Sequence, residues 1–174
     1  AYLSPLGEKA DATMQRLWGR LTEGEAPRQA VLTVKGRSFS PRQAAGTCAW
    51  FTFDQLCRDA RGASDYLAIV AEFDTVFIEG VPMMGSTMRN EAKRFITLID
   101  TLYDHNTRTV LTAQANPHGL YQGTSGAESF EFQRTASRLI EMQSVEYLNR
   151  FNSLSQRRSN VALPPDATGT ILLD

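Results

Sequence analysis

The chain has 174 residues, of which 42% are hydrophobic and 21% are charged, and its formal net charge is −1. These values suit one soluble globular domain, and they give no electrostatic reason to expect nucleic acid or an anionic membrane as a partner. No apolar run is long enough for a transmembrane helix, and no signal-peptide pattern opens the chain.

Two cysteines, Cys48 and Cys57, bracket a strand-like segment and lack the spacing of metal ligands. We therefore expect two reduced, buried thiols in a cytosolic protein. The chain begins with Ala rather than Met, and we expect it to be a piece of a longer protein.

The first third of the chain predicts a helix followed by a hairpin. After an irregular lead-in at residues 1–7, apolar residues recur at helical spacing over 11–21. A polar loop at 22–28 leads to a β-hairpin at 31–40, with its turn at Lys35-Gly36.

The next segment predicts one strand and two helices. Ala49–Phe53 is aromatic and β-prone, and Asp54 can cap a short helix over 55–59. Ser64 is the expected N-cap of a helix over 66–73.

Residues 75–121 predict a βαβ unit. A buried strand (Val76–Ile78) ends at Glu79, an amphipathic helix follows from Ala92, and Thr109–Thr112 forms a second buried strand. Two such strands joined by one helix form a parallel sheet with a right-handed crossover.

The rest of the chain predicts a Gly- and Ser-rich loop at 119–128, one or two helices within 129–148, and an extended or poorly ordered tail at 151–174. Only 170–173 could add a strand. The fold class is therefore α/β, with a parallel-sheet βαβ core, an N-terminal helix and hairpin, and C-terminal helices, all within residues 1–150.

Three residues are candidates for a nucleotide or metal site. Glu79 follows a parallel strand, where open α/β sheets place ligands, and an acid there holds Mg²⁺ in P-loop ATPases. Its alternative is a solvated strand-end carboxylate, and no GxxxxGK[ST] loop exists in the chain. Arg134 and Arg138 lie one helical turn apart and could meet an anion, or could form ordinary surface ion pairs. Arg89 and Lys93 are expected on a solvated face, and we expect no catalytic residue and no metal centre.

Four runs resemble one family: GTCAWFTFDQLC (Gly46–Cys57), SDYLAIVAEFDTVFIEGVP (Ser64–Pro82), RNEAKRFITLIDTLYDHNTRTVLTA (Arg89–Ala113) and FEFQRTASRLIEMQSVEYL (Phe130–Leu148). Together they are similar to the C-terminal part of ZapE-like cell-division ATPases of bacteria and of their mitochondrial AAA-type relatives. The resemblance covers residues 4–148.

The resemblance implies a cytoplasmic P-loop ATPase that uses ATP and Mg²⁺ and regulates a protein partner, the FtsZ division ring. It further implies that the phosphate-binding half lies outside this chain, which alone would be inactive and bind no cofactor tightly. Arg134 or Arg138 would sense the γ-phosphate, a homo-oligomeric ring is expected, and any membrane association would be peripheral. The alternative is a non-catalytic α/β protein-interaction module that recruits its partner through residues 50–53 or the helical C-terminus.

Overall fold

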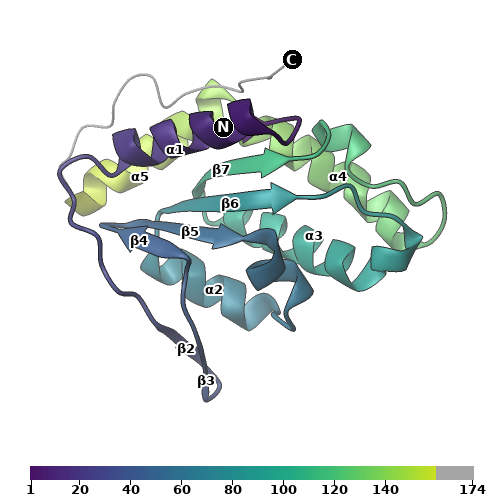
Figure 1. Ribbon diagram of the computed structural model, residues 1–174, viewed down its shortest axis with the longest axis horizontal. Coiled ribbons are helices and arrows are strands. Elements are labelled where there is room, and N and C mark those ends of the chain that lie inside the picture. The colour runs from purple at the N-terminus through teal and green to yellow at the C-terminus, as the bar shows by residue number, and fades with distance from the viewer. Residues whose placement is uncertain (160–174) are drawn as a thin grey trace.

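A five-stranded sheet in the order β1-β7-β6-β5-β4 organises the chain in the computed structural model, which describes residues 1–159 (Figure 1). The strands are β1 (Tyr2–Leu3), β2 (Leu32–Val34), β3 (Arg37–Phe39), β4 (Gln43–Ala45), β5 (Cys48–Thr52), β6 (Thr75–Val81) and β7 (Arg108–Ala113). In this sheet, β1, β7, β6 and β5 run parallel to one another, and β4 runs antiparallel to β5. Strands β2 and β3 form a separate antiparallel hairpin. The predicted α/β fold with a parallel sheet is confirmed.

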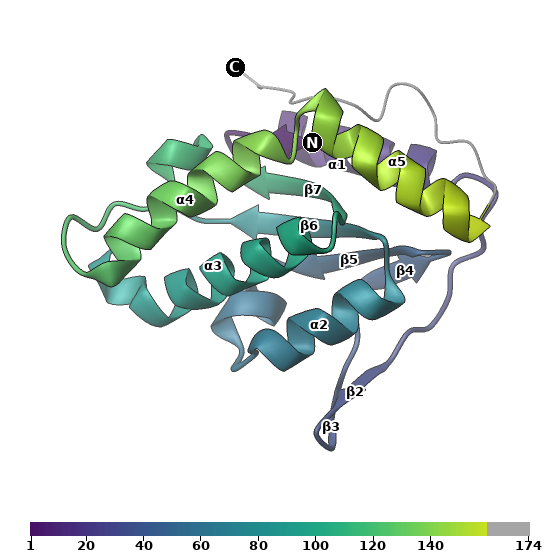
Figure 2. The same ribbon diagram turned by 180° about the vertical axis from the view of Figure 1, so that it is seen from behind.

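Five α-helices accompany the sheet in this part of the chain: α1 (Glu8–Leu21), α2 (Ala63–Glu72), α3 (Arg89–Asp104), α4 (Ala127–Glu141) and α5 (Val145–Ser159). Single turns of other helix types lie at Asp54–Arg58, Ser86–Met88 and Pro117–Gly119. Helices α2 and α3 make the two crossovers from β5 to β6 and from β6 to β7, and they cover one face of the sheet. Helix α1 lies on the opposite face, and α4 runs along α3 (Figures 1 and 2).

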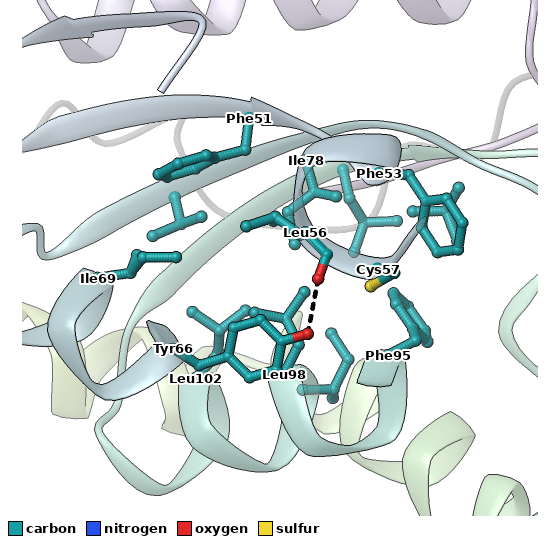
Figure 3. Close-up of a cluster of buried hydrophobic side chains, with 14 of the residues drawn as sticks. Phe51, Phe53, Leu56, Cys57, Tyr66, Ile69, Ile78, Phe95, Leu98 and Leu102 are labelled. Carbon is teal, nitrogen blue, oxygen red and sulfur yellow. Dashed lines mark hydrogen bonds between the residues drawn. The ribbon is translucent and has the colours of Figure 1, made fainter. Parts of the chain in front are cut away.

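The larger core fills the space between the sheet and helices α2 and α3. Figure 3 shows Phe51 and Ile78 of the sheet facing Ile69 of α2 and Phe95 of α3. The Tyr66 hydroxyl donates a hydrogen bond of 2.6 Å to the Leu56 carbonyl inside this core. That bond satisfies a buried polar group and ties α2 to the turn after β5.

A smaller core lies under α1. The rings of Trp50 and Phe77 stack with centroids 5.5 Å apart, and Trp18 of α1 packs edge-on against both. The apolar stripe predicted for the first helix is what covers this face, because Met14 and Leu17 are buried there.

The predicted hairpin is confirmed, and its turn residues Lys35 and Gly36 both have positive φ, at 51° and 78°. Two short strands, β1 and β4, were not predicted from the sequence. The lead-in forms β1 by pairing Tyr2 with Leu111, and β4 forms by pairing Gln43 with Trp50. Strands of two or three residues carry too little periodicity to be recognised, and the partner of β1, the strand β7, lies far away in the sequence.

Two predicted boundaries are wrong. Helix α2 begins at Ala63 after Gly62, not after Ser64, because the Asp65 carboxylate accepts the Gly62 N–H at 2.9 Å. Helix α5 continues to Ser159, so residues 151–159 are helical rather than an extended tail. The rest of the predicted tail, including the strand proposed at 170–173, lies outside the described residues.

Candidate functional site

Glu79 lies at the carboxyl end of β6, where the strand is interrupted by a bulge. The pairing with β7 shifts between Ile78 and Val81, and Gly80 has φ of 78°, a value that L side chains rarely adopt. The Gly80 N–H donates to Thr112 Oγ1 at 2.8 Å, which holds the bulge against β7. The bulge therefore ends the regular ladder next to the candidate acid.

The Glu79 carboxylate already has two partners within the chain. Trp50 Nε1 donates to Glu79 Oε2 at 3.1 Å, and the Arg42 guanidinium forms an ion pair with the same oxygen. The Glu79 side chain is 31% exposed. Both contacts fall on Glu79 Oε2, and neither Arg42 nor Trp50 was singled out from the sequence for this position.

Arg134 and Arg138 of α4 both form ion pairs with Asp100 of the neighbouring helix α3. Arg134 Nη2 lies 3.1 Å from Asp100 Oδ2, and Arg138 forms an ion pair with Asp100 Oδ1. The Arg138 guanidinium also lies 4.8 Å from the centroid of the Tyr103 ring. The sequence prediction that the two arginines share a side of the helix is correct, and the anion that they meet is a carboxylate of α3.

The ion-pair network continues toward α5. The Tyr103 hydroxyl donates to Glu141 Oε2 at 2.7 Å, and Arg150 lies 3.5 Å from the other oxygen of Glu141. The hydrogen bond to Glu141, followed by burial, raises the pKa of Tyr103. Opposite charges alternate across α3, α4 and α5, so this surface positions helices rather than presenting a uniform cationic patch.

A further cluster surrounds Glu128 in the first turn of α4. Its carboxylate lies 3.3 Å from Arg89 Nη2 and 3.1 Å from Lys93 Nζ, and the residue is only 1% exposed. A bond from its own backbone N–H, followed by the bonds from Lys93 and Arg89, lowers the pKa of Glu128. The expectation of a solvated face for Arg89 and Lys93 is confirmed, since their side chains are 59% and 60% exposed, but both also pair with the buried Glu128 carboxylate. An acid in a first helical turn is the only sequence signal for this cluster, because its partners lie more than thirty residues away in the chain.

The three candidates share no partner, because Glu79 pairs with Arg42 and Trp50 whereas both arginines pair with Asp100. Nowhere in residues 1–159 do three or more His, Cys, Asp or Glu side chains gather in a way that could hold a metal ion. Since the sequence also lacks a phosphate loop, these residues do not fit a Mg²⁺-nucleotide site of their own. None of the helices in residues 1–159 is long and apolar enough to cross a membrane.

Residues 1–151 match the family model of the AFG1-like ATPases. The chain belongs to the AFG1-like ATPase family. The AFG1-like chain is 38% identical over 149 residues to the cell division protein ZapE of Escherichia coli K12, a match that covers 86% of the chain and 39% of ZapE. It is 36% identical over 155 residues to lactation elevated protein 1 homolog B of Danio rerio, covering 72% of the chain and 31% of that protein.

The resemblance to ZapE-like proteins and to their AAA-type relatives is thereby confirmed. The AFG1-like chain spans less than two fifths of the length of either relative. No solved structure matches it significantly.

Proposed function

We propose that this chain is the C-terminal, partner-regulating part of a cytoplasmic AAA-type ATPase that acts in cell division. The whole protein would hydrolyse ATP with Mg²⁺ bound in a separate nucleotide-binding half, and its protein partner would be FtsZ. The observation that carries the proposal is the family match over residues 1–151 in a chain whose sequence contains no phosphate loop.

In this proposal, the missing half binds and hydrolyses ATP, and this chain regulates the partner; the ion pairs of the candidate residues support that arrangement. Glu79 pairs with Arg42, whereas Arg134 and Arg138 pair with Asp100, so the three candidates do not converge on one partner within this chain. We expect the 174-residue chain alone to show no Mg²⁺-dependent ATPase activity, whereas the whole protein hydrolyses ATP. Phosphate release measured for both proteins at equal concentration tests this, and turnover by the isolated chain would overturn it.

The proposed γ-phosphate sensor role of Arg134 or Arg138 needs a control for helix packing. In the whole protein, Arg134→Ala and Arg138→Ala should lower turnover if either arginine senses nucleotide. Asp100→Asn is the matched variant, because it releases the same arginines without removing them. Lost turnover in all three variants would assign the effect to packing of α4 on α3, and unchanged turnover in both arginine variants would remove the sensor role.

The second candidate function, a non-catalytic interaction module, cannot use residues 50–53 as first expected. Trp50, Phe51 and Phe53 are at most 2% exposed and lie in the two cores. Phe130 on α4 is instead 80% exposed, which favours the C-terminal helices as the contact surface. A pull-down of FtsZ by this chain and by the whole protein separates the candidates, since a pure recruitment module binds without the ATPase half.

A further inference from the structure

A cavity of about 170 Å³ lies between the turn at Pro117–Gly119, the segment that follows it, and α4. Its lining includes the exposed residues His118 and Gln133 and the buried residues Phe132 and Ala136. The cavity, which we call the α4 pocket, therefore leads from the surface down to an aromatic floor. None of the residues considered for nucleotide or metal binding lines it.

The walls of the α4 pocket are held in place by specific contacts. The Tyr121 ring stacks on Phe132 with centroids 5.4 Å apart and planes 21° apart. Gly123 makes room for that ring, because a Cβ at this position would lie 2.5 Å from it. Ser129 Oγ donates to the Gly123 carbonyl at 3.1 Å, which ties this segment to α4. The pocket is thus formed without a ligand.

Its size and lining define the ligand that it can take. A volume of about 150 Å³ is enough for one benzene ring, so the α4 pocket has room for a single ring system and not for a nucleotide. No Asp, Glu, Lys or Arg lines the pocket, so a charged group would lose hydration without gaining a counter-charge. The Tyr121 hydroxyl, the His118 imidazole and the Gln133 carboxamide make no hydrogen bond to the described part of the chain. The fitting ligand is a neutral aromatic ring that carries a hydrogen-bonding group.

The surroundings favour a protein as the source of this ring. The cations of the adjoining helices are engaged, Arg134 with Asp100 and Arg89 with Glu128, which leaves little to hold a nucleic-acid backbone. Two exposed apolar residues lie next to segments that line the pocket. Phe130, 80% exposed, follows Ser129 on α4, and Met83, 39% exposed, has its sulfur 4.0 Å from Gln122 Nε2. Aromatic and methionine side chains are enriched at protein interfaces.

We propose that the α4 pocket receives a tyrosine or tryptophan side chain of a protein partner, with Phe130 and Met83 packing against the residues around it. This deepens the proposed partner-regulating function and rests on it for the existence of a partner. The pocket is built by residues of this chain alone, so its binding of a ring is measured without ATP, FtsZ or the ATPase half.

The test is a titration of the ¹⁵N-labelled 174-residue chain with N-acetyl-tyrosinamide and N-acetyl-tryptophanamide, followed by amide chemical shifts. We expect saturable shifts confined to residues 83–85 and 117–137. Ala136→Leu, which fills the pocket, and Gly123→Ala, which displaces the Tyr121 ring, should each weaken binding at least tenfold. The exposed Gln133→Ala should weaken it severalfold. Gly85→Ala, where an added Cβ meets nothing within 4 Å, and Ser137→Ala should bind as the original chain does.

The same spectra show whether each variant is folded, and Gln133→Ala keeps the test decisive if the buried substitution at Ala136 unfolds the chain. Scattered or unsaturable shifts, equal binding by all variants, or saturable binding of adenosine in place of the amino-acid amides would overturn the proposal. Ring binding by a chain whose whole protein lacks ATPase activity would overturn the proposed function and leave the pocket assignment intact.

Discussion

The indole N–H of Trp50 donates to Glu79 Oε2 across a distance of 3.1 Å. This bond joins β5 to the acid at the end of β6, and the Trp50 ring also stacks on Phe77. Trp50 is only 2% exposed, and Glu79 is the acceptor that the structure gives its N–H. The sequence suggests Glu79 as a ligand residue, but in the fold its carboxylate accepts a hydrogen bond from a tryptophan of the smaller core.

Replacing Glu79 should therefore test the hydrogen bond separately from the ion pair. Glu79→Ala leaves the Trp50 N–H unsatisfied and should lower the free energy of unfolding by about 1–2 kcal/mol. Glu79→Gln keeps an acceptor and loses only the ion pair with Arg42, whose side chain is 54% exposed, so its cost should stay below about 1 kcal/mol. Urea unfolding followed by tryptophan fluorescence measures both. Equal losses in the two variants would mean that the charge, and not the hydrogen bond, matters.

The two arginines on Asp100 should differ in strength. Arg138 and Asp100 are 24% and 26% exposed, whereas Arg134 is 56% exposed. Double-mutant cycles with Asp100→Asn should give a coupling of about 0.5–1.5 kcal/mol for Arg138→Ala and about 0.2–0.5 kcal/mol for Arg134→Ala, because solvent screens the second pair. Chemical unfolding at low and high salt supplies the values. A larger coupling for Arg134 would contradict the geometry.

The elements that sequence analysis predicted well are those with long internal periodicity. The apolar stripe of α3 and the continuous apolar run of β6 both reflect burial, and burial leaves a local pattern in the sequence. The strand β1 and the true start of α2 depend instead on single long-range or backbone contacts, such as Leu111 pairing with Tyr2 and Asp65 accepting from Gly62.

For the candidate site, too, the sequence predicted local relationships but not long-range contacts. Helical spacing placed Arg134 and Arg138 together, because residues four apart share a helix face. It could not show that Asp100 holds both, or that Glu128 draws in Arg89 and Lys93, since those contacts join segments 34 to 39 residues apart. Ion pairs between residues far apart in the chain follow no fixed sequence spacing, so they cannot be read from the sequence.

The two cysteines should be unreactive in the folded chain. Both are free and buried, at 4% exposure for Cys48 and 0% for Cys57. Burial raises the pKa of Cys48 to about 11 and also raises that of Cys57, so almost no thiolate forms near neutral pH. At pH 8, Ellman's reagent should titrate no thiol quickly in the native chain and both after unfolding. Ser137→Cys on the exposed face of α4 provides a reactive control, and rapid native labelling without it would contradict the packing.

The buried carboxylate of Glu128 should make stability depend on pH. The pKa of Glu128 is lowered in the folded chain, first by its own backbone N–H and then by Lys93 and Arg89. Such a group stabilises the fold above its unfolded pKa of about 4.3, and this contribution is lost as the pH falls through the folded pKa. Glu128→Gln removes the charge, so its melting temperature should lie a few degrees below that of the original chain at pH 7, on the order expected for a domain of this size.

The gap between the melting temperatures of the original chain and Glu128→Gln should narrow as the pH is lowered from 5 toward 3, because protonation then makes the two side chains alike in charge. Glu131→Gln on the exposed side of α4 is the matched control and should show little difference from the original chain at either pH. A gap for Glu128→Gln that stays constant over this range would mean that the amide fails to fit the site for steric reasons. In that case the ion pairs with Arg89 and Lys93 would not be what anchors the start of α4 beside α3.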